Sequence, residues 1–394
     1  MNNYKLEELC EFIRNGASIK QFENAKGYPI TRIETIADSY INLERVGYAD
    51  IIDLSKYEDY LLNIGDILMS HINSEKHLGK TAIFENEDKK LIHGMNLLCI
   101  RPDKKLVSPK YLNYYFKSLA FKKQLPKITK KSVNQASFSV SDLKKLKCKI
   151  HSIESQKKIV KILDKSQELI DKRKKQIEKL DLLVKSKFIE MFGDPITNSK
   201  EWNTFELREG IKEIKYGTSK PPIFSEEGIP FVRATNIKFG RIIENDMKYI
   251  SEYEAEKIEK CKLSLGDTII VRSGANTGDN AFVSEEYVGS YGGYDIIVKL
   301  NEKINYIFLN ALLNSIYRET IIQPLTRRAG QPHLNSEQIQ SLVIYNPPIE
   351  LQNQFADFVK QVDKLKFELE KSLKELEDNF NSLMQKAFKG ELFN

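Results

Sequence analysis

The amino-acid sequence repeats itself once, at a distance of 196 to 201 residues. The matched segments are Gly27–Arg32 with Gly228–Arg233, Leu62–Ile67 with Leu263–Thr268, His93–Asn96 with Gly292–Asp295, and Ile153–Gln156 with Ile349–Gln352. This interval is far longer than the roughly 20–50 residues of solenoid repeats. It predicts two copies of one domain, each followed by one helix. Such internal pseudo-symmetry suits a partner that has two-fold symmetry of its own.

The length and composition are those of a globular protein. A chain of 394 residues has room for two or three domains that each bury a core. No apolar run approaches the length of a membrane span, and Met1–Glu8 lacks the basic-then-apolar order of a signal peptide. The four cysteines have no metal-ligand spacing. We therefore expect a cytoplasmic protein with reduced cysteines, no metal and no membrane partner.

The net charge of +6 is compatible with nucleic-acid binding but does not establish it. Most of the surplus lies in one segment, since residues 157–192 hold 11 Lys and Arg against 6 Asp and Glu. Two interpretations stay open for this segment: a solvated helix face, or a stripe that faces DNA or a partner protein.

Each copy begins with short runs that are rich in Val, Ile and Phe and are bounded by turn residues, which is typical of strands. A helix is expected at 109–123 in the first copy and at 304–321 in the second. The fold class predicted is α/β, with mixed α/β domains at 1–150 and 195–346. Long helices are expected at 151–194 and 347–394.

Heptad spacing of apolar residues marks both long segments and indicates a coiled coil. The residues assigned to this seam, or to a scaffold for partners, are Leu163, Ile170, Ile177, Leu180, Val184, Val359, Val362, Leu369, Leu373, Leu376 and Phe380. From Ile159 and from Phe355 onward, neither heptad stretch contains Pro or Gly before Gly193 and Gly390, which have the position of helix-ending glycines. We expect the two helices to pair with each other. The alternative is that each packs only on its own α/β domain.

Three fragments resemble enzyme motifs, but each is incomplete. Asn346–Ile349 has Ile where adenine methyltransferases have the aromatic residue that stacks on a flipped base. Gly79–Thr81 is half of a phosphate-binding loop, and its counterpart Gly278–Asn280 has no lysine. Pro102–Lys105 offers a single carboxylate, which cannot build a metal site. We therefore expect no catalytic residue and no cofactor bound by this chain.

Polar and basic residues in the segments between strands are the candidates for DNA binding, because Arg and Lys bond guanine edges and phosphates while Asn and Gln bond adenine. In the first copy they are Arg32, Thr35, His71, Asn73, Lys130, Lys131, Asn134 and Gln135. In the second copy they are Arg233, Thr235, Asn236, Arg272, Ser273, Asn276, Arg327, Arg328, Gln331 and His333. The positions match between the copies but the residue types differ, which predicts two different recognition surfaces on one scaffold.

Five further segments are distinctive in their order and duplication: Gly228–Ile237, Leu265–Gly274, Asn346–Gln354, Met191–Asn198 before Trp202, and Ala387–Leu392. With these segments, the chain resembles over essentially its whole length the specificity (S) subunit of Type I restriction-modification enzymes. The first copy departs from the family pattern at Thr31–Ile36 and between Asn63 and Phe84.

The resemblance implies two target recognition domains in pseudo-two-fold tandem, separated by two long helices that form an antiparallel coiled coil. Each domain would read one half of a bipartite target on double-stranded DNA. The implied partners are two methyltransferase subunits, and two restriction and translocase subunits where these are present. S-adenosylmethionine, ATP and Mg²⁺ would be used by those partners. Two other classes stay open, namely a freestanding DNA-binding adaptor without methyltransferase partners and an enzyme with an unrecognised active site.

Overall fold

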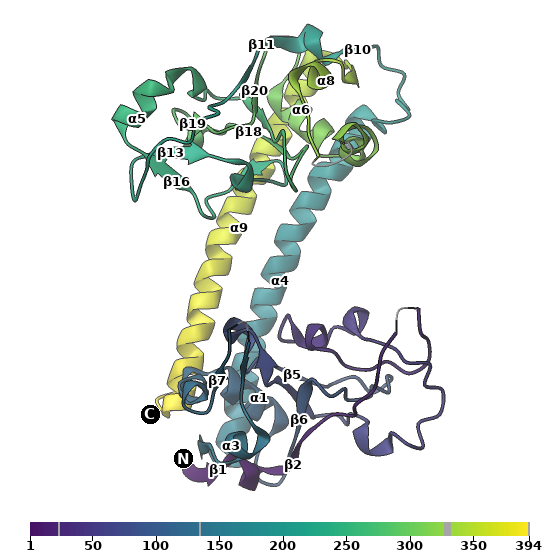
Figure 1. Ribbon diagram of the computed structural model, residues 1–394, viewed down its shortest axis with the longest axis vertical. Helices are drawn as coiled ribbons and strands as arrows, with labels where there is room; N and C mark the ends of the chain where they lie inside the picture. The colour runs from purple at the N-terminus through teal and green to yellow at the C-terminus, as the bar shows by residue number, and fades with distance from the viewer. Residues whose placement is uncertain (23, 134, 327–331, 393–394) are drawn as a thin grey trace. The chain divides into compact units, whose positions relative to one another are not determined.

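The structure, a computed structural model, describes residues 1–22, 24–133, 135–326 and 332–392. It divides into two compact units: unit 1 comprises 1–174 and 372–394, and unit 2 comprises 175–371. Each unit therefore holds one α/β domain together with a part of each long helix, α4 (Ile153–Phe192) and α9 (Ile349–Lys389) (Figure 1). The sequence boundaries treat each long helix as a separate segment, whereas the contacts divide both helices between the units.

Unit 1 is built on a four-stranded antiparallel sheet with the order β2-β6-β3-β5. A separate strand pair, β1 with β9, lies beside it, and β4, β8 and β7 form a small third sheet. The strands are β1 (Asn2–Lys5), β2 (Cys10–Asn15), β3 (Ile67–Ser70), β4 (Ile72–Asn73), β5 (Thr81–Ile83), β6 (Leu97–Pro102), β7 (Lys130–Lys131), β8 (Ala136–Ser137) and β9 (Lys147–Ile150). The helices are α1 (Pro109–Lys117), α2 (Leu119–Lys122) and α3 (Val140–Lys144).

Unit 2 repeats this framework. Its main sheet has the order β11-β20-β17-β18, which matches β2-β6-β3-β5, and the pair β10–β21 matches β1–β9. The strands are β10 (Thr204–Glu206), β11 (Ile211–Tyr216), β12 (Phe224–Ser225), β13 (Ile229–Val232), β14 (Ile237–Lys238), β15 (Arg241–Ile242), β16 (Lys248–Ile250), β17 (Thr268–Ile270), β18 (Asn280–Phe282), β19 (Tyr291–Gly292), β20 (Ile296–Leu300) and β21 (Val343–Tyr345). The helices are α5 (Glu252–Lys257), α6 (Tyr306–Leu313), α7 (Gln323–Thr326) and α8 (Ser336–Gln340).

The repeated Gly-Asp sequence forms the turn that leads into the central strand of each main sheet. Gly65 and Gly266 have positive φ angles of 96° and 79°, a conformation that glycine adopts without steric cost. The next residue, Asp66 or Asp267, closes the turn by accepting a hydrogen bond of 2.8 Å from the backbone N–H three residues earlier. The repeat of Leu62–Ile67 as Leu263–Thr268 therefore has a structural role.

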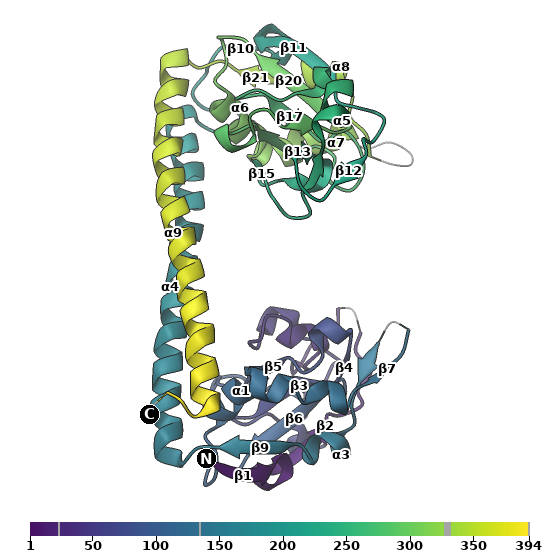
Figure 2. The same ribbon diagram turned by 90° about the vertical axis from the view of Figure 1, so that its left-hand side faces the viewer.

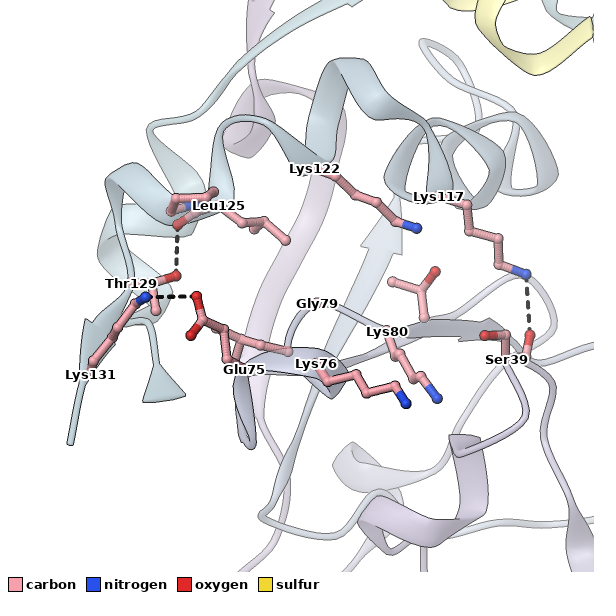
Figure 3. Close-up of a pocket in the computed structure, with 13 residues that line it drawn as sticks. Ser39, Glu75, Lys76, Gly79, Lys80, Lys117, Lys122, Leu125, Thr129 and Lys131 are labelled. Atoms are coloured by element: carbon pink, nitrogen blue, oxygen red, sulfur yellow. Dashed lines mark hydrogen bonds and ion pairs between the residues drawn. The ribbon is translucent and has the colours of Figure 1, made fainter. Parts of the chain in front are cut away.

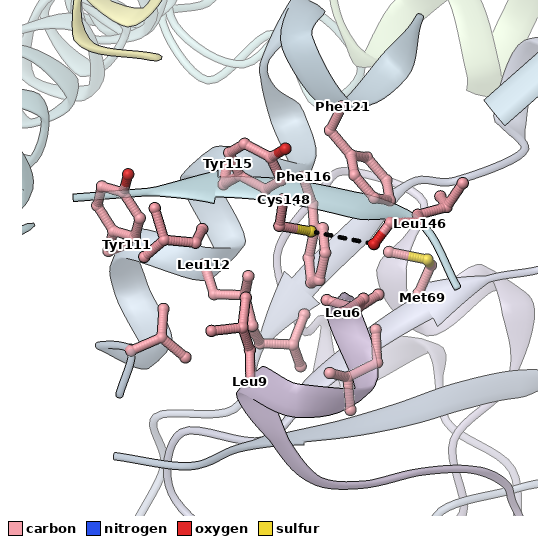
Figure 4. Close-up of a cluster of buried hydrophobic side chains, with 14 of the residues drawn as sticks. Leu6, Leu9, Met69, Tyr111, Leu112, Tyr115, Phe116, Phe121, Leu146 and Cys148 are labelled. Carbon is pink, nitrogen blue, oxygen red and sulfur yellow. Dashed lines mark hydrogen bonds between the residues drawn. The ribbon is translucent and has the colours of Figure 1, made fainter. Parts of the chain in front are cut away.

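Buried aromatic residues join the domain of unit 1 to its part of the long helices. Tyr111 and Tyr115 of α1 pack against Phe388 of α9, with ring centroids 5.3 and 5.6 Å apart. The same core holds Ile159 and Leu163 of α4, both fully buried. Figure 4 shows that α1 presents Tyr111, Leu112 and Tyr115 to this core together with Leu6 and Leu9. In unit 1, α1 therefore packs between the domain core and the long helices.

Unit 2 uses phenylalanines at the equivalent place. Phe308 of α6 packs against Phe188 and Phe192 of α4, with centroid distances of 5.9 and 4.8 Å. Phe355 of α9 packs against the same two rings at 5.6 and 5.4 Å. The core of unit 2 is thus continuous with its helix pair.

The two long helices pair with each other, as the heptads predict, and they run antiparallel, as the family resemblance implies. Lys174 pairs with Glu377 at 2.8 Å in unit 1, and Asp181 pairs with Lys366 at 2.5 Å in unit 2, so partner numbers fall on α9 as they rise on α4. Of the heptad residues, the buried ones are Leu163, Ile170, Val359 and Val362; the half-buried ones are Ile177, Leu180, Val184, Leu369, Leu373, Leu376 and Phe380. The expectation that the helices pair with each other is confirmed, and the alternative that each packs only on its own domain is wrong, although the helix ends also pack on the domains.

A buried glutamine fixes each domain to the helix that follows it. In unit 1, Gln156 accepts a hydrogen bond from the backbone N–H of Ser108 at 2.7 Å and donates to the carbonyls of Leu106 and His151. In unit 2, Gln352 accepts from the N–H of Asn305 at 2.9 Å and donates to the carbonyls of Lys303 and Pro347. Both glutamines have no exposed surface. The Ile-Glu-x-Gln repeat is explained by this shared anchor.

Candidate nucleic-acid interface

Polar residues of unit 1 gather on the small β4-β8-β7 sheet, which lies at the end of the unit away from the long helices (Figure 2). Asn73 stands on β4, Lys130 and Lys131 form β7, and Gln135 precedes β8. The two lysines and Gln135 are exposed, and Lys131 pairs with Glu75 at 2.7 Å. The structure thus brings these four predicted residues together on one surface.

His71 does not belong to that surface. Only 6% of the residue is exposed, and its ring packs 6.4 Å from the ring of Phe138. Burial lowers the pKa of the imidazole, so the ring is neutral near pH 7. The expectation that His71 contacts DNA is corrected on this physical ground, because the side chain faces the core beneath β4.

Arg272 is the best-positioned candidate in unit 2. Its guanidinium lies between the rings of Tyr216 and Tyr294, with the central carbon 4.4 Å from each ring centroid. Stacking between two rings holds a guanidinium flat and costs it little hydration. Its outer nitrogen lies 3.3 Å from a ring nitrogen of His333. Such a fixed planar donor suits the edge of a guanine or a phosphate.

Ser273 and His333 lie beside Arg272, because the two segments form an antiparallel β-bridge. The backbone N–H of Leu334 donates to the carbonyl of Arg272 at 2.7 Å and closes this contact. Asn276 follows in the same turn, half-buried. The predicted residues Asn134, Arg327, Arg328 and Gln331 lie outside the described residues.

Asp295 lies beneath Arg272. Its carboxylate accepts a hydrogen bond from the Arg272 backbone N–H at 3.2 Å and is 4% exposed. Burial raises the pKa of this carboxyl to about 6, against the opposing charge of Arg272. The candidate site of unit 2 therefore rests on a carboxylate that is costly to ionise.

We expect Asp295→Asn to stabilise unit 2 by about 1–2 kcal/mol at pH 7–8, since the amide oxygen keeps the acceptor and removes the buried charge. The folded-state pKa of about 6 lies above the ordinary 3.8. The stability that the protonated carboxyl contributes is therefore fully present below pH 3.8 and is lost as the pH rises through about 6. Urea unfolding of both proteins between pH 4 and 8 checks this. Asp357→Asn, at an exposed position, is the control, and a pH-independent gain would contradict the expectation.

Thr35 and Asn236 are corrected in the same way as His71, since neither has exposed surface. The Thr35 hydroxyl accepts from the N–H of Arg32 at 2.8 Å and donates to the carbonyl of Arg45. The Asn236 side chain accepts from the N–H of Arg233 at 3.1 Å and donates to two backbone carbonyls. Both residues therefore close a short 3₁₀ turn at matched positions, and their hydrogen bonds are used within the fold.

The neighbouring predicted residues are more accessible. Arg32 and Thr235 are exposed, while Arg233 is half-buried. Arg32 is held by the side chain of Gln21, and Arg233 donates to the carboxylate of Asp246 at 2.9 Å. Either guanidinium would have to exchange an existing partner before it could bond a DNA group.

Sequence reasoning missed the residues that position these groups. Tyr216 and Tyr294 were not singled out, although Tyr294 directly follows the repeated Gly292–Gly293. Unit 1 has a stacked arginine of its own, Arg14, whose guanidinium lies 4.3 Å from the Phe12 ring centroid and 5.4 Å from that of Tyr60. Arg14 stands on β2 rather than at the position of Arg272, so comparison of the two copies could not find it.

Within the described part of the chain, no group of His, Cys, Asp and Glu is arranged to hold a metal ion. No helix in that part is long and apolar enough to cross a membrane. The backbone N–H of Asn346, in the incomplete methyltransferase-like motif, donates a hydrogen bond of 2.7 Å to the carbonyl of Asn203. The motif leads directly into α9. Its prolines therefore have the structural role of leading the chain from β21 into the helix.

Known proteins with similar sequences are found along most of this chain. A family model described as the Type I restriction modification DNA specificity domain matches residues 1–181 and 199–378. The putative type I restriction enzyme MjaX specificity subunit of Methanocaldococcus jannaschii is 34% identical over 378 residues, covering 92% of this chain and 86% of that protein. The type I restriction enzyme EcoKI specificity subunit of Escherichia coli is 22% identical, over 74% of this chain and 67% of that protein.

Solved structures agree on the fold. The S subunit of a Type I restriction-modification system from M. genitalium matches with a TM-score of 0.59 at 16% identity, over 98% of this chain and 96% of that chain. A structure described as the basis of complex assembly and conformational transition of the type I R-M system matches with a TM-score of 0.56 at 16% identity, over 99% and 98%. The tandem arrangement of α/β domains and long helices is shared along the whole chain.

Proposed function

Since the chain belongs to the Type I restriction-modification DNA specificity family, we propose that each of its two α/β domains reads one half of an asymmetric, bipartite target on double-stranded DNA. One observation carries this proposal. The two main sheets have the same strand order, yet the groups at matched edges differ: Asn73, Lys130, Lys131 and Gln135 in unit 1, against Arg272, Ser273 and His333 in unit 2. Two domains that share a main sheet but present different polar side chains are suited to recognise different bases.

The long helices are the scaffold for the partner subunits in this proposal. Several large apolar side chains on α4 and α9 are exposed, among them Leu182 at 60%, Leu365 at 52% and Phe367 at 65%. Exposed apolar groups of this size on paired helices are typical of protein-binding surfaces. Two methyltransferase subunits would bind there, and two restriction and translocase subunits would join where they are present.

The chemistry in this assembly belongs to the partners. The methyltransferase subunits would use S-adenosylmethionine, and the motor subunits ATP and Mg²⁺, while this chain supplies sequence recognition without catalysis. Mapping methylated adenines in a host that carries this chain with its methyltransferase tests the proposal. A bipartite motif with two unlike halves supports it. Methylation by the isolated chain, or a specific DNA complex unaffected by the methyltransferase, would favour an enzyme or a freestanding adaptor instead.

We expect Arg272→Ala to weaken recognition at one half-site only, by about 1–3 kcal/mol if the guanidinium makes a bidentate contact. Removing the side chain also leaves Tyr216 and Tyr294 without the group that they stack on. Binding assays with DNA altered in one half-site at a time check this. Arg241→Ala is the matched control, because that arginine is in the same unit and pairs with Asp363 of α9. Equal loss at both half-sites would contradict the assignment of one half-site to each domain.

A further inference from the structure

Unit 1 contains a hollow lined by five lysines, which we term the lysine pocket: Lys76, Lys80, Lys117, Lys122 and Lys131, with Glu75 as the one acidic lining residue. Its volume of about 410 Å³ is within the roughly 300–1,000 Å³ of small-ligand sites. Figure 3 shows Lys117 and Lys122, from α1 and α2, on one side of the hollow and Lys76 and Lys80 on the other. Four chain segments thus contribute lysines to its lining.

The charges of this pocket are poorly compensated within the unit. Lys80 and Lys117 donate to the neutral carbonyls of Ala37 and Ser39 at 2.7 and 3.2 Å. Glu75 is already engaged by Lys131 at 2.7 Å. The side chains of Lys76 and Lys122 make no hydrogen bond or ion pair with any residue that the structure describes.

Nearby acidic groups are also engaged. The carboxylate of Glu85, whose charge acts on Lys117, forms an ion pair with Lys110 at 3.1 Å. The carboxylate of Asp38 forms an ion pair with Arg45 at 3.1 Å. Burial and the charge of Lys122 lower the pKa of Lys117, so its ammonium lies in an environment that is short of negative charge. An anion in the pocket would relieve this repulsion.

In unit 2, the positions that correspond to Lys80 and Lys117 carry no unpaired positive charge. Asp279 stands at the place of Lys80, directly before the edge strand, and forms an ion pair with Arg318. Asn314 stands at the place of Lys117, nine residues after the helix N-cap in each unit, and donates to Asn280 at 2.7 Å. The frame does not require lysines here, so the positive charge is a property of unit 1 alone.

The floor of the pocket offers a further donor. The Thr81 hydroxyl, on a residue that is 1% exposed, has no hydrogen-bond partner among the described residues. The Gly79–Thr81 segment is not a nucleotide-binding P-loop, because a strand, β5, follows it rather than a helix. Lysine ammoniums with a buried hydroxyl form a donor set suited to phosphate oxygens.

We propose that the lysine pocket is a phosphate-binding site, and that in the DNA complex it receives a backbone phosphate next to the half-site read by unit 1. The location favours DNA as the source, because Lys131 belongs both to this pocket and to the β4-β8-β7 surface. This assignment rests on the proposed function, whereas phosphate binding itself does not.

The experiment uses the full chain carrying Lys76→Gln and Lys122→Gln, since these two lysines make no described contact whose loss would affect folding. With its methyltransferase and the mapped target, the dependence of the logarithm of the binding constant on the logarithm of the salt concentration is expected to be shallower by about 1, because one phosphate contact and its counterion release are lost. Titration with inorganic tripolyphosphate is expected to show binding by the unaltered chain and at least a tenfold loss in the variant. Lys149→Gln, at an exposed lysine on β9, is the control for general charge.

The outcomes separate the two levels of the proposal. Loss of tripolyphosphate binding with an unchanged DNA salt slope would show a phosphate site filled by a free anion and overturn the DNA assignment. No change in either measurement would overturn the site altogether. If the unaltered complex has no specific DNA target, the proposed function fails, and the tripolyphosphate titration still decides the pocket.

Discussion

Gln352→Leu is expected to lower the free energy of unfolding of unit 2 by about 3–5 kcal/mol, because it leaves three buried backbone groups without partners. The leucine has similar volume, so the loss comes from the N–H of Asn305 and the carbonyls of Lys303 and Pro347. Each unpaired buried group costs about 1–3 kcal/mol. The loss falls at the junction between α6, the end of β21 and α9.

Hydrogen exchange by mass spectrometry measures this effect separately for each unit, alongside urea unfolding of the full chain. Peptides of 204–345 should lose protection, while those of 1–150 keep it. Gln354→Leu, two residues further on and exposed, is the matched control and should change stability by less than about 0.5 kcal/mol. Gln156→Leu should instead reduce exchange protection in unit 1, in peptides of 1–150. Equal effects of Gln352→Leu and Gln354→Leu would show that the anchor is dispensable.

Phe355→Ala is expected to cost about 3–5 kcal/mol, the usual range for removing a buried phenyl ring. Phe355 has no exposed surface, and its ring packs edge-on against Phe188 and Phe192 of α4. These two rings also hold Phe308 of the domain. The substitution therefore loosens the helix pair and the domain together.

Thermal unfolding of the isolated chain, with exchange protection of α4 residues 184–192 as the local measure, checks the prediction. Phe367→Ala removes the same side chain from an exposed position of the same helix and is the control. Loss of protection in α9 alone, with the domain unaffected, would contradict the role of Phe355 as a shared packing residue.

The frame was predictable from the sequence because its signals are local and appear twice. The heptads of Leu163 and Val359 predicted the long helices, and the recurrence of Gly65-Asp66 as Gly266-Asp267 belongs to the repeat that predicted two copies of one domain. The repeated strand order follows, since one pattern of apolar runs and turns folds in one way.

The site was less predictable, because residue type does not reveal what a side chain already bonds. Thr35 and Asn236 have the chemistry of base readers, but their hydrogen bonds close turns inside the fold. His71 is buried by its contact with Phe138, a residue 67 positions away in the sequence. The stacking of Arg272 between Tyr216 and Tyr294 likewise depends on segments that only the tertiary fold brings together.

The glutamine anchors have a consequence for how this architecture changes over evolutionary time. Gln156 and Gln352 bond only main-chain atoms of the domains that they hold. These hydrogen bonds do not depend on the side chains of the attached domain. They depend on its backbone path near the start of α1 or α6 and at the end of β9 or β21. A domain of different sequence but equal framework could be exchanged at these joints in a single recombination event. New specificity would then arise without a compensating change in the helices, provided that the incoming domain keeps the aromatic residues of α1 or α6 that pack on them.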